Sequence, residues 1–288
     1  MVNKKTIAFI GAGAMAEAMI SGVVSSNSIP AEHIFVTNRS NTNRLKQLEN
    51  EYGINGIPQN ELEINQMDVI ILAMKPKDAE TSLQIIRNIV KPHQLILSVI
   101  AGLTTSSIER MLPEAQQVIR AMPNTSCKIG ESATALSRGK NTTNLNFSWA
   151  IQFFECIGKV YVIPEEQMHT FTGIAGSGPA YYYYFMECME KEGIKANIPK
   201  GTIRQIVAQT ILGAAKMIQE QGESPEVLRE NITSPNGTTA AGLKALFEHG
   251  GGEAITHAVL QAAIRSCEIS HQLDKSILSN KVQQLERK

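Results

Sequence analysis

The chain has 288 residues, of which 43% are hydrophobic and 19% charged, as in a globular protein with one large domain or two ordinary ones. Basic and acidic residues number 27 each, so the net charge is zero and the basic surface of a general nucleic-acid binder is not expected. The four scattered cysteines lack zinc-site spacing, and no segment approaches the roughly 20 apolar residues of a membrane span. We therefore expect a soluble cytoplasmic protein with neither a membrane nor a metal as partner.

The first half of the chain alternates short β-rich runs with helical patterns, which is typical of a parallel α/β sheet. We predict a Rossmann-type, doubly wound domain over residues 1–163. The predicted strands are Thr6–Ile10, Ile34–Thr37, Asp68–Ala73, Leu95–Val99, Gln117–Ala121, Ala133–Ser137 and Val160–Ile163. The predicted helices between them are Met15–Ser25, Asn43–Tyr52, Lys77–Val90, Ser106–Met111 and Leu145–Cys156.

After Pro164 only helical spacing is found, and we predict an all-helical domain over residues 164–288. Its helices are expected at Gln167–Thr172, Ala180–Lys191, Lys200–Gln219, Pro225–Glu230, Ala241–His249 and Glu253–Asp274. The segment 203–212 carries more apolar residues than one face of a surface helix needs. A larger core within the domain would explain this. Helix–helix dimerisation, which we favour, would give a homodimer or a larger oligomer built from dimers.

A glycine turn, Gly11-Ala12-Gly13-Ala14-Met15-Ala16, follows the first predicted strand directly and opens the first predicted helix. This context matches the fingerprint of a dinucleotide-binding turn. Gly11 would make the tight turn, Gly13 would admit the pyrophosphate, and Ala16 would take the third glycine's place in helix–strand packing. An ordinary glycine-containing turn is the alternative, and the context favours a dinucleotide.

The end of the second predicted strand, Asn38-Arg39-Ser40, indicates which dinucleotide binds. A site for NAD usually has an acid there to accept hydrogen bonds from the ribose 2′-hydroxyl. Here no carboxylate would repel a 2′-phosphate, and Arg39, with Arg44 one helical turn beyond, could hold one. We therefore expect NADP(H), with NAD(H) as a second possibility. The alternative is that both arginines are solvated surface charges.

A second turn, Ser234–Leu243, precedes a predicted helix in the second half. Asn236-Gly237 is a strong turn former, and Thr238 and Thr239 follow where free backbone N–H groups of a new helix point outward. Plain helix capping would need one hydroxyl residue. A carboxylate held by these N–H groups, with a hydroxyl aimed at the reacting atom, would also account for the second threonine and for Ser234.

A third glycine-containing segment, Gly176–Tyr181, begins the first long helix of the second half. It could be a plain helix start, or it could leave room at Ser177 and Gly178 for substrate or cofactor to approach the backbone. None of the six histidines pairs with a cysteine or a carboxylate at metal-ligand spacing, and structural roles are expected for them.

These motifs in this order resemble the pyrroline-5-carboxylate reductase family over nearly the whole chain. The most specific segment is Asn231–Leu243, in which Asn236-Gly237 replaces the family's usual Gly-Gly and Glu230 replaces a frequent Asp. Asparagine tolerates positive φ better than most residues, so we expect the loop to keep its shape. The other segments that carry the resemblance are Phe9–Ala16, Leu72–Pro76, Ile100–Gly102, Arg120–Thr125 and Gly176–Tyr181.

The resemblance implies the positions of both sites. It implies cofactor contacts at Ala12, Gly13, Ala14 and Met15 for the pyrophosphate, at Asn38, Arg39 and Ser40 for the adenosine end, and at Asn60, Met74, Lys75, Ala101 and Asn231 nearer the nicotinamide ribose and phosphates. To these we add Gly11 and Ala16 of the glycine turn, and Ala73 and Pro76 beside Met74 and Lys75. The resemblance also implies a substrate-carboxylate site at the Gly237–Thr239 backbone, to which we add Ser234, Ser177 and Gly178. No residue is expected to bind a metal.

The expected reaction is hydride transfer from NADPH to C5 of 1-pyrroline-5-carboxylate, which gives L-proline. Thr239 is expected to be the catalytic residue, with its hydroxyl on the ring nitrogen. Two alternatives stay open at this point: an NADP(H)-dependent reductase of another cyclic imino acid, and a non-catalytic NADP(H)-binding regulatory paralogue.

Overall fold

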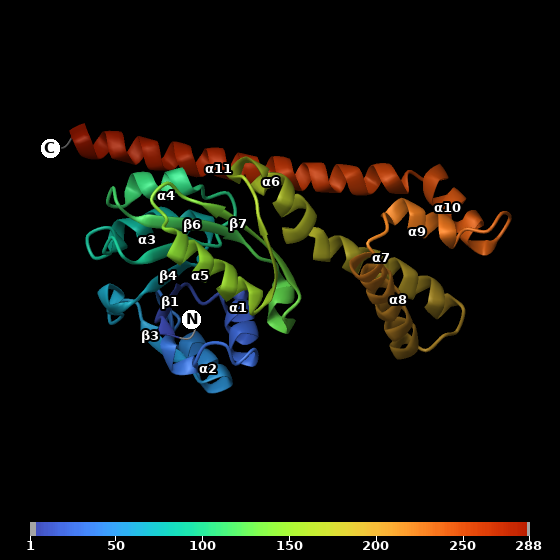
Figure 1. Cartoon of the computed structure of the whole chain (residues 1–288), viewed down its shortest axis with the longest axis horizontal. Helices are drawn as coiled ribbons and strands as arrows, with labels where there is room; N and C mark the ends of the chain where they lie inside the picture. Colours follow the sequence, from blue (N-terminus) through green and yellow to red (C-terminus); the bar gives the residue numbers. More distant parts are fainter. Residues whose placement is uncertain (1–3, 287–288) are drawn as a thin grey trace. The chain divides into compact units, whose positions relative to one another are not determined.

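The first half of the chain forms an eight-stranded sheet in the order β3-β2-β1-β4-β5-β6-β7-β8 (Figure 1). The structure is a computed structural model, and it describes residues 4–286. The strands are β1 (Ile7–Ile10), β2 (Ile34–Asn38), β3 (Asn55–Pro58), β4 (Val69–Leu72), β5 (Leu95–Ser98), β6 (Gln117–Met122), β7 (Ser132–Arg138) and β8 (Gly158–Val162).

The centre of the sheet is parallel and apolar. β1 lies between β2 and β4, with Ile7 opposite Ile34 on one side and Val69 on the other. Strands β1, β4 and β5 are buried along their whole length. Such continuous apolar runs are expected where helices cover both faces of a parallel sheet. The parallel arrangement also brings the carboxyl ends of these strands to one edge of the sheet, where ligands bind in this fold class.

Two features of the sheet differ from the sequence prediction. Strand β3 was not predicted, because Gly56 and Pro58 in a four-residue run indicate a turn; proline is accommodated because β3 lies at the sheet edge. The second difference is that β7 runs antiparallel to β6. Only a short 3-10 helix, Thr125–Ile129, lies between β6 and β7, which is too little chain for a parallel crossover.

Helices cover both faces of the sheet, so the predicted doubly wound fold is confirmed. Helices α1 (Ala14–Ser25), α2 (Thr42–Tyr52) and α5 (Asn144–Glu155) pack on one face through Met19, Leu48 and Phe153. Helices α3 (Ala79–Ile86) and α4 (Thr105–Met111) pack on the other, where Ile277 of the last helix joins the same core.

From Glu165 onward, the described part of the chain contains helices and no strand, as predicted. These are α6 (Met168–Phe171), a π-helix (Thr172–Gly176), α7 (Gly178–Lys195), α8 (Lys200–Gln221), α9 (Pro225–Asn231), α10 (Thr238–Glu248) and α11 (Gly251–Glu286). Over residues 4–286, none of the helices is both long and apolar enough to cross a membrane.

The boundary between the two compact units does not fall at 163/164, where the sequence pattern changes from alternating strands and helices to helices alone. One unit comprises Met1–Ser177 together with Leu260–Lys288, and the other comprises Gly178–Val259. The first unit extends past Pro164 because the Asn124 side-chain amide donates to the Ala175 carbonyl at 3.0 Å. It includes the later part of α11 because Ile277 packs in the sheet's second core. The two units are described separately below.

Replacement of Phe153 by alanine tests the α5 side of the core. Phe153 is fully buried and stacks on Trp149 with ring centroids 5.2 Å apart. We expect Phe153→Ala to lower the free energy of unfolding by about 3–5 kcal/mol, because it leaves a cavity between helix and sheet. The exposed Leu145 of the same helix is the control, and Leu145→Ala should change it by less than about 0.5 kcal/mol. Urea titration measures both, and equal effects would contradict the packing described here.

Candidate active site

The turn after β1 has a backbone that only glycine fits. Gly11 has φ +116°, and a Cβ built on it would lie 2.7 Å from the Ala73 carbonyl oxygen at the end of β4. The Gly11 N–H donates to the Thr37 carbonyl at 3.0 Å, which ties the turn to the end of β2. Gly13 is the N-cap of α1 and offers no side chain to cap it. The first N–H groups of α1 are therefore left for an anion, as the sequence predicts.

A cavity of about 590 Å³ lies beside this turn at the carboxyl ends of β1, β2 and β4. It brings together eight of the predicted cofactor residues: Gly11, Ala12, Gly13, Asn38, Arg39, Ala73, Met74 and Lys75. Thr37 also lines it, and its buried hydroxyl has no hydrogen-bond partner within the described residues. A buried hydroxyl without a partner is costly unless a ligand supplies one. The size, the glycine turn and this hydroxyl all fit a dinucleotide.

The two arginines after β2 have different roles. Arg39 is exposed on the cavity wall, and the turn that carries it is shaped by the Asn38 side chain, which accepts from the Ser40 N–H at 3.3 Å. Arg44 instead donates through Nε to the Ala12 carbonyl at 3.1 Å and forms an ion pair with Glu17. The interpretation of Arg44 as a free phosphate-binding or solvated cation is therefore wrong. Its guanidinium supports the glycine turn and neutralises an acid in the first turn of α1.

Seven predicted cofactor residues of the first unit lie outside the lining of that cavity. One of the seven, Pro76, lines a neighbouring cavity of about 570 Å³ against α11, which Lys75 of the first cavity also borders. Ala101 lies in the loop between β5 and α4. The remaining five are Ala14, Met15 and Ala16 in the first turn of α1, Ser40 after β2, and Asn60 after β3. Asn231 ends α9 in the second unit, and its contact with the cofactor stays a prediction.

Some residues of the cavity were not predicted from the sequence. Thr37 precedes the Asn38-Arg39 motif directly, and its place at a strand end was an available signal. Thr81 and Ser82 lie on α3, which follows β4. No local pattern marks them, because only the packing of α3 beside the end of the sheet places them on the cavity.

The second turn lies wholly in the second unit. Gly237 is the N-cap of α10 and has no side-chain capping bond, so Thr238 and Thr239 are the first two helical residues. Plain capping by either threonine is therefore wrong. Asn236 has φ +58°, as expected for an asparagine in a glycine's place, and the Gly237 N–H donates to the Ser234 carbonyl at 3.0 Å. The turn thus presents uncapped N–H groups beside hydroxyl side chains.

Ser177 and Gly178 lie at the junction of the two units. A π-helix, Thr172–Gly176, precedes them, and the Ser177 N–H donates to the Thr172 carbonyl at 2.9 Å. π-Helical turns are rare in proteins, but those that occur often lie at functional sites. Within residues 4–286, no group of three or more His, Cys, Asp or Glu side chains is placed to hold a metal ion.

Comparison with known proteins gives consistent matches over most of the chain. Residues 165–269 match the family described as pyrroline-5-carboxylate reductase dimerisation, and residues 6–102 match the NADP oxidoreductase, coenzyme F420-dependent family. Pyrroline-5-carboxylate reductase 1 of Bacillus subtilis is 58% identical over 95% of this chain and 92% of its own length. Pyrroline-5-carboxylate reductase 2 of the same organism is 43% identical, covering 93% and 96%.

Solved structures of pyrroline carboxylate reductases are also similar to this chain. The pyrroline carboxylate reductase of Plasmodium falciparum, solved with NADP bound, has a TM-score of 0.86 at 28% identity and covers 93% of this chain and 99% of its own. The 1-pyrroline-5-carboxylate reductase of Streptococcus pyogenes has a TM-score of 0.82 at 30% identity, covering 91% and 98%.

Arg39 provides a test of the cofactor cavity. We expect Arg39→Ala to weaken NADPH binding by about tenfold or more, because a charge-assisted contact to the 2′-phosphate is lost, and to leave NADH binding unchanged. Lys46→Ala, at an exposed position on α2, is the control for loss of one positive charge. Fluorescence titration measures all the dissociation constants. An equal loss of NADPH affinity in both variants would show that only general electrostatics is involved.

Proposed function

The chain belongs to the pyrroline-5-carboxylate reductase family and reduces 1-pyrroline-5-carboxylate to L-proline with NADPH, and we propose that its two glycine turns hold the two reactants. The observation that carries the proposal is the pair of uncapped helix N-termini, at Gly13 in one unit and at Gly237 in the other. One suits a pyrophosphate and the other a carboxylate.

The first turn and its cavity hold the cofactor. The N–H groups at the start of α1 face the pyrophosphate, Arg39 pairs with the 2′-phosphate, and the Thr37 hydroxyl hydrogen-bonds to the bound dinucleotide. Met74 and Lys75, at the end of β4, line the same cavity. Bound NADPH supplies the hydride.

The second turn holds the substrate. The backbone N–H groups of Thr238 and Thr239 bind the substrate carboxylate next to Gly237, whose own N–H is bonded to the Ser234 carbonyl. The Thr239 hydroxyl contacts the ring nitrogen, and Ser177 and Gly178 leave room for the ring near the backbone. A carboxylate fixed in this way sets which face of the ring is presented for reduction.

The reaction requires little acid–base catalysis by side chains of the protein. Once the imine nitrogen is protonated, addition of a hydride at C5 completes the secondary amine of proline, and no further proton has to be removed. Positioning is then the main contribution of the protein. This agrees with a substrate turn built from backbone N–H groups and hydroxyls.

We also infer a homodimer or a larger oligomer built from dimers. Ile203 and Val207 of α8 are buried, whereas Ile206 and Leu212 of the same helix are about half exposed, so the helix has apolar surface beyond its own core. Phe247 of α10 is 69% exposed. Sedimentation equilibrium should give the mass of a dimer or of a multiple of it. A monomer at micromolar concentration would refute this proposal.

We place the enzyme in the cytoplasm, because Cys127, Cys156, Cys188 and Cys267 are all free thiols. Free thiols persist in a reducing compartment. Labelling with a thiol reagent before and after denaturation, in freshly lysed cells, would test whether all four are reduced.

Thr239 is the residue whose role is tested most directly. We expect Thr239→Ala to bind NADPH as the wild type does and to lower kcat/KM for 1-pyrroline-5-carboxylate about tenfold or more, as for one lost oriented hydrogen bond. Thr239→Ser, which keeps the hydroxyl, should recover most of the loss. Unchanged kinetics in the alanine variant would remove Thr239 from the mechanism.

The reaction itself is tested by mixing the protein with NADPH and 1-pyrroline-5-carboxylate and following the absorbance of the reduced nicotinamide. Substrate-dependent oxidation with proline as product is expected, faster with NADPH than with NADH. Preference for the six-membered homologue would indicate a reductase of another imino acid. If NADPH binds without turnover and L-proline fails to raise the Tm of the NADP⁺-loaded protein, a non-catalytic protein would be indicated.

A further inference from the structure

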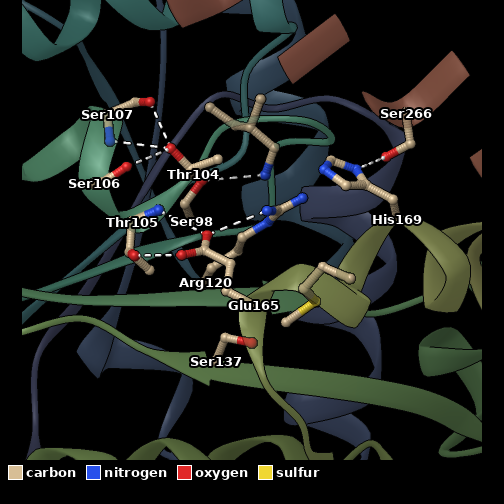
Figure 2. A network of polar contacts seen from close by, with 12 residues as sticks. Ser98, Thr104, Thr105, Ser106, Ser107, Arg120, Ser137, Glu165, His169 and Ser266 are labelled. Atoms are coloured by element: carbon tan, nitrogen blue, oxygen red, sulfur yellow. Dashed lines mark hydrogen bonds and ion pairs between the residues drawn. The ribbon is translucent and has the colours of Figure 1, made fainter. Parts of the chain in front are cut away.

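A partly buried carboxylate, that of Glu165, holds the first residue of α4 from a distant part of the chain (Figure 2). Its Oε1 accepts from the Thr105 N–H at 2.8 Å, and its Oε2 accepts from the Thr105 hydroxyl at 2.5 Å. Glu165 begins the short 3-10 helix, Glu165–Gln167, that follows β8. The N-terminus of a helix is usually capped by its own N-cap residue. Here the N-terminus of α4 is also held by a residue from a distant part of the chain.

The same carboxylate is fixed by Arg120 of β6. Arg120 Nη1 lies 3.2 Å from Glu165 Oε1, and the arginine side chain is only 2% exposed. Burial lowers the pKa of Arg120, and the Glu165 carboxylate opposes that shift. A buried cation needs its counter-ion close by, so Glu165 has little freedom to move.

The surroundings of Arg120 offer no substitute for Glu165. No second carboxylate pairs with Arg120 within residues 4–286, and its Nη2 has no hydrogen-bond partner there. His169 lies nearby and is bonded through Nδ1 to the Ser266 hydroxyl at 2.9 Å. Burial, and then the charge of Arg120, lower the pKa of His169, so a neutral imidazole lies beside the cation. Among the described residues, Arg120 therefore depends on Glu165 for its counter-ion.

Thr105 directly follows the loop 99–104, whose first residue is bonded to the end of β4, next to the cofactor cavity. The Val99 N–H donates to the Leu72 carbonyl at 3.1 Å, directly before Ala73 and Met74 of the cavity wall. The loop's own hydrogen bonds are few and long: the Ile100 N–H donates to Ser98 Oγ at 3.3 Å, and the Leu103 N–H donates to the Ile100 carbonyl at 3.3 Å.

One side of this loop is fixed by close packing. Gly102 has φ +80°, and a Cβ built on it would lie 2.7 Å from Ile269 Cγ2 and 3.0 Å from the Ser270 nitrogen of α11. The loop is therefore pressed against α11 at Gly102 and anchored to β4 at Val99. At its far end, Glu165 fixes Thr105 and so limits how Ala101 can be placed.

We propose that Glu165, held by Arg120, is a positioning residue that fixes the 99–104 loop at the carboxyl edge of the sheet, beside the end of β4 that lines the cofactor cavity. This inference rests on the proposed function, since it takes the cofactor's position from it. Glu165 acts through Thr105 and touches neither substrate nor cofactor. The loop it positions is distinct from the Arg39 turn, which serves the 2′-phosphate.

Two variants test the proposal, and binding is measured without turnover. Thr105→Val removes the hydroxyl that bonds to Glu165 Oε2 but leaves the Arg120 ion pair in place. Glu165→Gln removes the charge. We expect the Kd for NADPH to rise about threefold or more in Thr105→Val and about tenfold or more in Glu165→Gln. The Kd for adenosine 2′,5′-bisphosphate, which lacks the nicotinamide half, should stay within about twofold of the wild type. Thr105→Ser should bind NADPH as the wild type does.

The matched control is Thr142→Val. Thr142 is also buried, and its hydroxyl donates to the Val118 carbonyl at 2.6 Å, away from the loop. It should lower the Tm and leave both dissociation constants unchanged. Unaltered NADPH affinity in Thr105→Val would overturn the inference, as would an equal loss of affinity for the bisphosphate, which would indicate general destabilisation. A wild-type protein that does not bind NADPH at all would instead refute the proposed function and, with it, this inference.

Discussion

The close approach of Gly11 to the end of β4 is the constraint on which the site depends. The Gly11 N–H bonds to the Thr37 carbonyl, and a Cβ at Gly11 would lie 2.7 Å from the Ala73 carbonyl oxygen. One residue thus joins the ends of β1, β2 and β4. The join brings the Arg39 turn and the Met74–Lys75 segment to the same cavity, and it leaves the N-terminus of α1 open beside them. Any side chain at this position would force these segments apart.

Two ion pairs support the loops around that edge of the sheet. Arg44 and Glu17 lie behind the glycine turn, where Arg44 also binds the Ala12 carbonyl. Arg120 and Glu165 lie behind the loop between β5 and α4. Partly or fully buried ion pairs contribute little net stability, because the desolvation of both charges offsets their attraction. Their evident effect here is geometric, since each holds a backbone segment that the cofactor is proposed to contact.

In the proposed assignment, the two reactants are held by different compact units. The first contains the glycine turn, the cavity and the loop with Ala101, and the second contains the substrate turn at Gly237. Both turns use the same device, a glycine N-cap that leaves helix N–H groups unpaired. A reaction that needs only a hydride at C5 and a fixed ring can be served by such backbone sites.

The sequence by itself determined the strand–helix alternation and the two glycine turns that open helices, because each depends on local signals: apolar runs, glycine and asparagine at positive φ, and hydroxyls at a helix start. It did not reveal β3, whose Gly56 and Pro58 are typical of a turn, nor the antiparallel β7, because strand pairing is a long-range property. The contacts of Arg44 and Glu165 could not be predicted from the sequence for the same reason. Their partners, Glu17 in one case and Thr105 and Arg120 in the other, are far away in sequence. Only the tertiary structure decided these roles, because packing alone determines which charges lie together away from water.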